Sequence, residues 1–217
     1  MIINNDTSLK VAEFLLQIKA IIIRPDKPFV WASGWKSPIY CDNRRTLSYP
    51  RIRTYIRQQL TSAVEENFGK PDLIAGVATG GIAQGVLVAE ELGVPFVYVR
   101  PNAKEHGMGN IIEGVVESGQ SVIVIEDLIS TGKSSLTAVE ALRKADCLVK
   151  GLVSIFTYNF EVTTQSFKTN NCPLISLCDY DVLLTKAVET NYINESEIMR
   201  LNLWHDNPEG WLADGTD

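Results

Sequence analysis

The chain has 217 residues, of which 45% are hydrophobic and 21% are charged, as in an ordinary globular protein. This length predicts a single domain with a sizeable core. The formal net charge of −6 argues against a general nucleic-acid binder and against a membrane-surface binder. No apolar run approaches the roughly 18 residues that span a bilayer, and the N-terminal segment lacks a signal-peptide pattern.

The cysteines indicate a reducing compartment. Cys41, Cys147, Cys172 and Cys178 show no CxxC pairing and no nearby histidine cluster. We therefore expect reduced thiols and a cytoplasmic protein. Metal ligation by Cys172 and Cys178 is the less favoured alternative.

The first 45 residues predict a helix followed by a hairpin. Thr7 and Ser8 suit a helix cap, apolar residues recur at helical spacing as far as Ile22, and Pro25 and Pro28 would end the helix. Residues 29–40 alternate in part around a Ser–Gly turn, which predicts a hairpin. Residues 41–45 are a polar cluster that fits either a solvated turn or a ligand site.

The rest of the chain alternates between strand and helix patterns. We expect strands at 73–77, 95–100, 111–116, 122–125, 148–156 and 174–177, and helices at about 51–67, 80–92, 134–144, 182–187 and 193–201. This order predicts an α/β fold with a doubly wound, mostly parallel sheet flanked by helices. Ligands bind such sheets beyond the carboxyl ends of the strands. The tail with Trp204 and Trp211 is expected to fold back onto the domain, with His205 in a structural role.

Residues 122–136 carry the clearest functional pattern. Four β-branched apolar residues read as a strand buried on both faces, and Glu126 and Asp127 follow them directly. Small hydroxyl residues and Gly132 come next, before an amphipathic helix. Loop amides at a helix start attract a phosphate, and a carboxylate pair accepts hydrogen bonds from vicinal hydroxyls. Together they predict a site for a ribose 5-phosphate.

Two other interpretations of this stretch exist. It could be an ordinary βα unit with a polar loop, although adjacent acids after so apolar a strand are then hard to explain. Residues 132–134 match the end of a Walker A loop, but that motif needs a glycine where Asp127 stands. The Walker A interpretation therefore fails.

Two further loops fall at the same predicted edge. Thr79, Gly80 and Gly81 lie between a strand and a helix, where a second phosphate could bind. Residues 100–110 are long, polar and without apolar periodicity, and they include Arg100, Lys104 and His106. Such a segment is typical of a functional lid, with a solvated hairpin tip as the alternative.

The chain resembles a known enzyme family over nearly its whole length. Residues 122–136 are similar to the motif with which type I phosphoribosyltransferases bind phosphoribosyl pyrophosphate (PRPP). Residues 33–40, 76–82 and 100–107 resemble the substrate-side hairpin, pyrophosphate loop and lid of orotate phosphoribosyltransferases. The resemblance implies one domain over 1–217, with a small N-terminal hood at about 1–45 and a tail, 190–217, that packs on the core.

The implied reaction transfers the 5-phosphoribosyl group from PRPP to orotate, giving orotidine 5′-monophosphate and pyrophosphate in pyrimidine synthesis. Lys104, His106 and Asp127 would be catalytic, and Ser130 and Lys36 would contact orotate. The implied PRPP site comprises Thr79, Gly80, Arg100, Lys104, His106, Glu126, Asp127, Leu128, Ile129, Ser130, Thr131, Gly132, Lys133 and Ser134. Mg²⁺ would arrive mainly on PRPP, without a dedicated protein ligand cluster. The resemblance also implies a homodimer whose lid acts across the interface, with no nucleic-acid or membrane partner.

The base-binding half departs from the family pattern. Many relatives carry a lysine where this chain has Asn102 and another where it has Ala32, and residues 156–159 lack an arginine that longer forms use for the orotate carboxylate. Lys36, Arg44 and Arg45 are the candidates for that contact. The alternatives for the whole chain are a phosphoribosyltransferase for another base and a non-catalytic PRPP-sensing regulator.

Overall fold

The computed structural model describes residues 2–31, 34–101 and 111–211. Its helices are α1 (Asn5–Gln17), η1 (a 3-10 helix, Asn43–Ser48), α2 (Pro50–Phe68), α3 (Gly80–Leu92), α4 (Lys133–Lys144), α5 (Glu161–Thr169), α6 (Tyr180–Glu189) and α7 (Glu195–Asp206). Its strands are β1 (Ile21–Ile23), β2 (Phe29–Val30), β3 (Lys36–Ser37), β4 (Ile39–Cys41), β5 (Leu73–Val77), β6 (Phe96–Val99), β7 (Ile112–Glu113), β8 (Ser121–Ile129), β9 (Leu148–Thr157) and β10 (Leu174–Asp179). No described helix is long and apolar enough to cross a membrane.

The main sheet confirms the predicted doubly wound architecture. Its strand order is β10-β9-β8-β5-β6-β7, and every neighbouring pair is parallel except β6 with β7. From β5 the chain runs through α3 to β6 on one side, whereas β8 and β9 extend the sheet on the other. The strand order therefore reverses between β5 and β8. The loops that follow these two strands flank the crevice where such sheets bind ligands.

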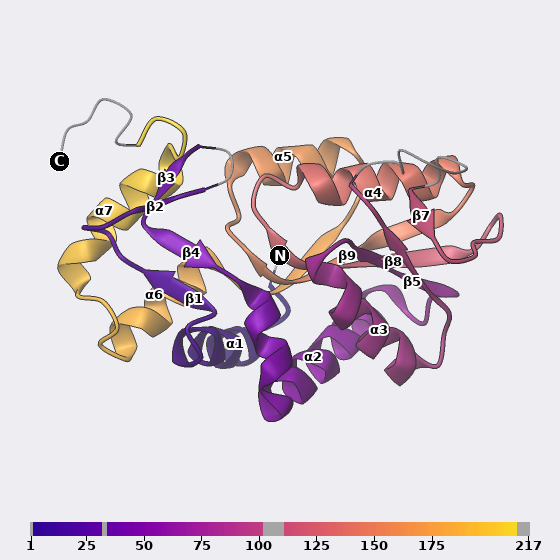
Figure 1. Ribbon diagram of the computed structural model, residues 1–217, viewed down its shortest axis with the longest axis horizontal. Coiled ribbons are helices and arrows are strands. Elements are labelled where there is room, and N and C mark those ends of the chain that lie inside the picture. Colours follow the sequence, from indigo (N-terminus) through magenta and orange to yellow (C-terminus); the bar gives the residue numbers. More distant parts are fainter. Residues whose placement is uncertain (1, 32–33, 102–110, 212–217) are drawn as a thin grey trace.

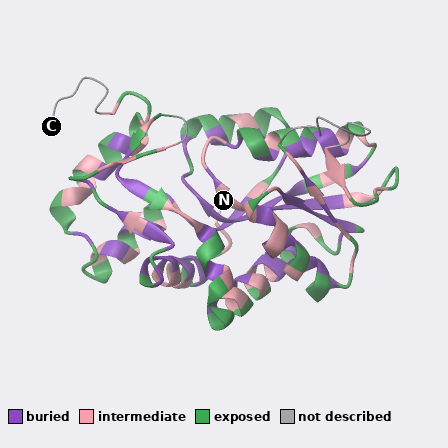
Figure 2. Cartoon of the chain, viewed as in Figure 1, coloured by how far each residue is buried: buried purple, intermediate pink, exposed green. Residues whose placement is uncertain are grey.

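The sheet is covered on both faces, as the apolar strand β8 predicts. Ile123 and Ile125 belong to the core cluster that contains residues of α1, α2 and α3. Val122 and Val124 belong to a second cluster, with residues of α4 and α5. Figure 1 shows α4 and α5 on one side of the sheet and α1, α2 and α3 on the other. Figure 2 shows that the strands between them are buried while the outer helix faces are exposed.

A smaller unit of short strands lies beside the main sheet. β1 pairs with β4, and β2 pairs with β3 as the predicted hairpin. Figure 1 shows these strands at the end of the molecule where α7 lies. Trp204 of α7 is fully buried, and its indole N–H donates to the carbonyl of Lys36 at 3.2 Å. We call β1 to β4 the hood.

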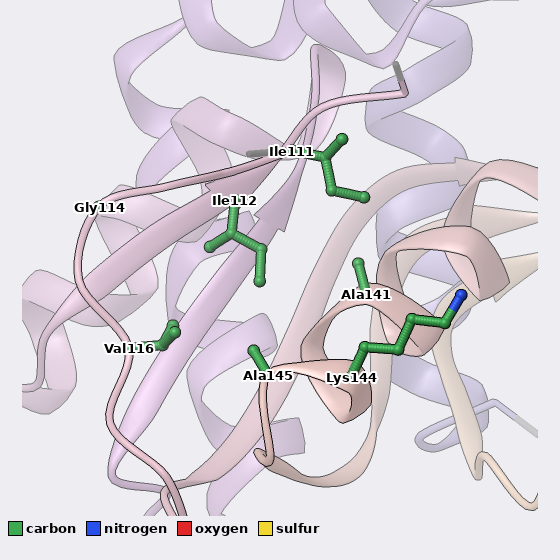
Figure 3. Close-up of a pocket in the computed structure, with 7 residues that line it drawn as sticks. All are labelled: Ile111, Ile112, Gly114, Val116, Ala141, Lys144 and Ala145. Atoms are coloured by element: carbon green, nitrogen blue, oxygen red, sulfur yellow. The ribbon is translucent and has the colours of Figure 1, made fainter. Parts of the chain in front are cut away.

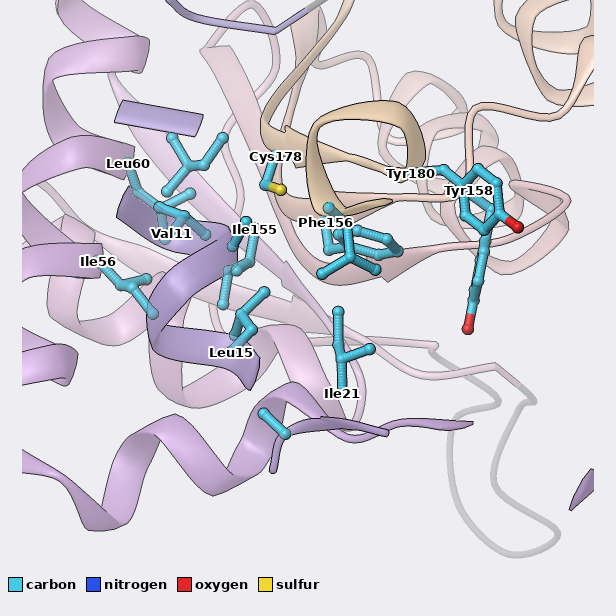
Figure 4. Packing of buried hydrophobic residues seen from close by; sticks show 14 of the residues in the cluster. Val11, Leu15, Ile21, Ile56, Leu60, Ile155, Phe156, Tyr158, Cys178 and Tyr180 are labelled. Atoms are coloured by element: carbon cyan, nitrogen blue, oxygen red, sulfur yellow. The ribbon is translucent and has the colours of Figure 1, made fainter. Parts of the chain in front are cut away.

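Aromatic side chains join the hood to the core. The Trp31 ring lies 5.2 Å from that of Tyr158 and 5.7 Å from that of Trp204. His205 stacks on Tyr180 at 4.4 Å, in the structural role that the sequence predicts. Figure 4 shows Tyr158 and Tyr180 at one end of a core that continues to Leu15 of α1. Packing of this kind fixes where the hood sits over the carboxyl edge of the sheet.

The structure corrects two expected element bounds, shortens the expected strand at 111–116 to β7, and adds a helix, α5. α1 ends at Gln17, and Ile22 belongs to β1, because pairing with β4 outweighs the helical spacing of the apolar residues. β8 continues past Ile125 to Ile129, so the acid pair lies within the strand and not after it. α5 was not expected, because only Thr163 and Phe167 of its residues are buried and its apolar pattern is weak.

Candidate active site

A cavity of about 390 Å³ opens where the loops after β5 and β8 meet the hood. Its lining combines three segments that are far apart in the sequence: Cys41, Asp42 and Arg44; Ala78, Thr79 and Gly80; and Glu126, Asp127, Leu128 and Ser134. The cavity lies at the strand-order reversal, where ligand binding is expected. The cavity thus brings together the acid pair, Glu126 and Asp127, and the glycine loop with Thr79 and Gly80. All four residues are predicted to bind PRPP.

The two carboxylates of the acid pair differ in their surroundings. Glu126 is 5% exposed, and its Oε2 accepts a hydrogen bond from the Ser135 hydroxyl at 3.1 Å. Its Oε1 accepts from the main-chain N–H of Asp127 at 3.0 Å. Both carboxylates line the cavity, but Glu126 is held by hydrogen bonds within the protein, whereas Asp127 is only partly buried.

Burial raises the pKa of both carboxylates in the pair. Burial raises the pKa of Glu126 well above its usual range, and the neighbouring negative charge of Asp127 adds to the shift. Burial also raises the pKa of Asp127, while the guanidinium of Arg44 opposes that rise. Arg44 is thus close enough to Asp127 for its charge to act there.

Glycines at the start of α3 allow this helix to approach the acid pair. A Cβ atom on Gly80 would lie 2.2 Å from the Asp127 carboxyl carbon, and one on Gly81 would lie 2.4 Å from the carbonyl oxygen of Ile125. Either contact is too short for a side chain. Because both positions are glycine, the first turn of α3 rests against the end of β8, beside the carboxylate.

A second cavity, of about 360 Å³, adjoins the first. Leu128 and Ser134 line both, and the other lining residues are Pro101, Ser130, Thr131, Gly132, Lys133, Ser135 and Thr137. Gly132 has φ of 77°, a left-handed conformation that favours glycine, and α4 begins directly after it. The free amides at the start of α4 make this loop suited to a phosphate.

Two neighbours hold the loop of residues 130–134, which we call the phosphate loop, in place. The Thr163 hydroxyl of α5 donates to the main-chain carbonyl of Ser130. Tyr158 donates its main-chain N–H to the carbonyl of Ile129 at 3.0 Å. The side chain of Ile129 is fully buried in the core, so Leu128 and not Ile129 presents a side chain to the cavities.

The 3-10 helix η1 supplies the only described cation that lines the first cavity, Arg44. Its Nε donates to Asp42 at 2.6 Å, and this contact lowers the pKa of Asp42. The neighbouring Arg45 is directed elsewhere, since its Nε donates to the carbonyl of Ile18. Lys36 lies on β3, outside the described lining of this cavity.

The lid prediction falls largely outside the described residues. Lys104 and His106 lie in the range 102–110, which the structure does not describe. The flanking residues are joined, because Arg100 donates its main-chain N–H to the carbonyl of Ile111 at 2.8 Å. Arg100 Nη1 also lies 3.4 Å from Glu113 Oε1. Pro101, the last described residue before the gap, lines the phosphate-loop cavity.

Oxygen donors for a metal ion are present but few. Among the residues that the structure describes, no group of three or more His, Cys, Asp or Glu side chains could hold an ion. The carboxylates of Asp42 and Asp127 line the first cavity. One or two carboxylates combined with substrate phosphates are a usual environment for Mg²⁺. The donor set thus fits an ion that enters with a phosphorylated ligand.

Sequence reasoning missed several residues at the site. Asn43 is fully buried and donates to the carbonyl of Asp127, yet residues 41–45 read equally well as a solvated turn. Ser135 and Thr163 hold Glu126 and the phosphate loop, and nothing in their local sequence marks these roles. Only the polar character of 41–45, next to the hairpin, could have pointed to Asn43.

A third cavity, of about 330 Å³, has a mostly apolar lining that includes one cation, Lys144. Figure 3 shows it between the segment around β7 and the C-terminal end of α4, with Ile111, Ile112 and Ala141 directed into it. Its lining on α4 begins at Ala141, one helical turn after Thr137, which lines the second cavity.

Comparisons with known proteins agree with the geometry. A model of the phosphoribosyl transferase domain matches residues 48–160. Orotate phosphoribosyltransferase of Phocaeicola vulgatus is 54% identical over 202 residues, which cover 93% of this chain and 95% of that protein. The Listeria innocua enzyme of the same name is 50% identical over 93% of this chain and 97% of its own. The crystal structure of orotate phosphoribosyltransferase from Aeropyrum pernix has a TM-score of 0.73 and 26% identity, and the match covers 85% of this chain and 99% of that one.

Proposed function

We infer that this chain, which belongs to the orotate phosphoribosyltransferase family, transfers the 5-phosphoribosyl group of PRPP to orotate. The products are orotidine 5′-monophosphate and pyrophosphate, and the step belongs to pyrimidine biosynthesis. The observation that carries this function is the cavity in which the acid pair, the Thr79–Gly80 loop and the hood converge. A ribose with phosphates at both ends requires such a combination of groups.

We propose that the acid pair and the phosphate loop hold the two sides of the ribose phosphate. Asp127, which faces the cavity, accepts hydrogen bonds from the ribose hydroxyls, and Glu126 supports it from the buried side. Ser130, Thr131, Gly132, Lys133 and Ser134 bind the 5′-phosphate with loop amides, hydroxyls and the start of α4. Fixed in this way, the anomeric carbon is held between leaving group and acceptor.

The leaving group needs positive charge that the described lining does not supply. Three carboxylates and one guanidinium line the first cavity, whereas PRPP is strongly anionic. We propose that Arg100, Lys104 and His106 close over the pyrophosphate, which lies against Thr79 and Gly80. Asp127 and Asp42, which line the cavity, would hold a Mg²⁺ ion that arrives with PRPP, and the ion would supply positive charge to the phosphates. Lid closure also excludes water from an oxocarbenium-like transition state.

Of the three cations considered for the orotate carboxylate, Arg44 has the best support. It lines the cavity with Asp127, and Asp42 holds its guanidinium by a 2.6 Å hydrogen bond. Arg45 donates to the carbonyl of Ile18 instead, and Lys36 lies outside the described lining. Lys36 and Ser130 remain proposed orotate contacts.

We further propose a cytoplasmic homodimer in which each lid acts on the partner's site. Four free cysteines support the reducing compartment. The dimer is proposed from family resemblance.

The function is tested by the loss of orotate absorbance in the presence of PRPP and Mg²⁺. One pyrophosphate should appear for each orotate consumed, and omission of PRPP should abolish the change. Consumption of orotate without stoichiometric pyrophosphate would contradict phosphoribosyl transfer.

A further inference from the structure

Asn43 makes a buried connection between η1 and the acid pair. Its side chain is fully buried, and its Nδ2 donates to the main-chain carbonyl of Asp127 at 2.6 Å. Its Oδ1 accepts from the Cys41 thiol at 3.4 Å. This amide thus uses one end to hold the strand at Asp127 and the other to hold the cavity-lining residue Cys41.

Asn43 is itself held by two further buried polar groups. The Thr46 hydroxyl donates to the main-chain carbonyl of Asn43 at 2.6 Å. Gln84 of α3 then donates its Nε2 to the Thr46 oxygen at 3.1 Å. Thr46 is 0% exposed and Gln84 is 1% exposed, so water cannot replace these hydrogen bonds without rearrangement. The donors follow one another in a single direction: Gln84 to Thr46, and Thr46 to Asn43.

The chain of contacts closes on itself through α3. Gln84 lies one turn after Gly80, and Gly80 lies directly against the carboxylate of Asp127. Asn43 therefore fixes the main chain of Asp127, while the start of α3 fixes the position available to its side chain. We call Asn43, Thr46 and Gln84 the Asn43 relay.

We propose that Asn43 is a positioning residue for Asp127, held in register by Thr46 and Gln84. The proposal rests on the proposed function of Asp127 in binding the ribose hydroxyls. A displacement of a substrate-binding carboxylate by about 1 Å can lower the reaction rate on the order of 100-fold, even when the substituted residue does not touch the substrate. The relay thereby makes the ribose contact depend on how η1, which follows the hood, is packed.

The test compares variants that break the relay with a variant that breaks a similar buried bond elsewhere. Asn43→Ala removes the donor to Asp127, and Thr46→Val removes the hydroxyl with little change in shape. Thr46→Ser keeps the hydroxyl and should therefore keep PRPP binding and turnover. The control is Ser8→Ala on α1. Ser8 is also fully buried, and its hydroxyl donates to the carbonyl of Leu177 at 2.6 Å.

PRPP affinity is measured by calorimetry without any base, and kcat/KM for PRPP is measured with orotate. Asn43→Ala and Thr46→Val should lower both about 10- to 100-fold. In Thr46→Ser and Ser8→Ala, PRPP affinity and kcat/KM should stay within about 3-fold of the wild-type values. Ser8→Ala should still lower the melting temperature, because it removes a buried hydrogen bond. Thr46→Val and Thr46→Ser keep the test decisive if Asn43→Ala does not fold.

A double-mutant cycle separates positioning from general damage. In an Asp127→Asn background, Asn43→Ala should cause no further loss of PRPP affinity, because its effect runs through that carboxylate. Additive losses, or a loss equal to that of Ser8→Ala, would overturn the proposal. PRPP binding without orotate turnover in the wild type would instead refute the proposed function, and the calorimetric cycle would still decide the role of Asn43.

Discussion

Glu126 and Asp127 are adjacent, yet the fold gives them different tasks. Glu126 is enclosed by Ser135 and the main chain, whereas Asp127 faces the cavity and the guanidinium of Arg44. Two adjacent carboxylates, one of them buried with a raised pKa, are an arrangement typical of functional sites. The cost falls on the stability of the free protein.

Glu126→Gln should make the free protein more stable at neutral pH than the wild type. The raised pKa of Glu126 means that the native state holds a proton that the unfolded chain releases above its ordinary value of 4.5. The contribution of Glu126 to stability is therefore full below about 4.5 and is lost as pH rises through the raised pKa. Glutamine does not ionise, so the melting-temperature difference between variant and wild type should grow between pH 4.5 and 8, by about 2–4 °C per kcal/mol.

Glu140→Gln on α4 is the matched control for this titration. Glu140 is exposed and pairs with Lys144 at 2.7 Å, which lowers its pKa. Its replacement should produce no rise in stability with pH. A flat difference between Glu126→Gln and wild type across this range would contradict burial of an ionisable Glu126.

Arg44→Ala should selectively impair the use of orotate. If Arg44 binds the orotate carboxylate, its loss lowers kcat/KM for orotate by about 10- to 100-fold, as expected for a charge-assisted hydrogen bond of about 1.5–3 kcal/mol. PRPP affinity, measured without base, should change much less. Arg45→Ala is the control, because Arg45 donates to the carbonyl of Ile18 and not toward the cavity. Equal losses in the two variants would remove Arg44 from base recognition.

At the scale of elements, α7 is expected to act on the base side of the site. Trp204 packs against Trp31 and donates to the carbonyl of Lys36 in the hood hairpin. Trp204→Phe keeps most of the packing and loses this hydrogen bond, which is worth about 0.5–1.5 kcal/mol. We expect a raised KM for orotate, about 3- to 10-fold, with PRPP affinity unchanged. Kinetics with each substrate varied in turn test this, and a rise confined to the PRPP constant would contradict it.

The sequence predicted elements best where one face or both faces of an element are uniformly buried. β5 has the predicted bounds, and α2 and α3 lie within two residues of theirs. The extent of α1 was wrong because Ile21 to Ile23 continue a helical spacing but pair with β4, a contact that depends on residues 39–41. α5 was missed because a helix with so few buried residues has hardly any periodicity to detect.

The same reasoning explains which parts of the site were predictable. The acid pair and the phosphate loop are contiguous, so their local chemistry points to a ligand. In the Asn43 relay, Thr46 and Gln84 are 38 positions apart in the sequence, and Asn43 is 84 positions from its partner Asp127. No member of the relay has a local sequence signature. Contacts of this kind depend on tertiary packing, which periodicity and composition do not describe.

At the scale of the whole molecule, a dimer in which each lid serves the partner's site predicts recovery of activity on mixing. Lys104→Ala should lower kcat far more than it weakens orotate binding, because the lid acts on developing leaving-group charge. Asp127→Asn should be impaired at the ribose. When the two inactive variants are mixed and allowed to exchange subunits, half of the dimers are hybrids, and each hybrid holds one intact site. About a quarter of wild-type activity should return, whereas no recovery despite verified exchange would contradict a shared site.

The most direct test of the central claim is the base specificity of the wild-type protein. With PRPP and Mg²⁺, orotate, uracil, hypoxanthine and adenine are offered in parallel and kcat/KM is measured for each. Turnover of orotate, with uracil disfavoured by at least about 10-fold because it lacks the carboxylate, is the result expected from Arg44 beside the acid pair. Preferred turnover of another base, or binding of PRPP with no turnover of any base, would contradict orotate phosphoribosyl transfer.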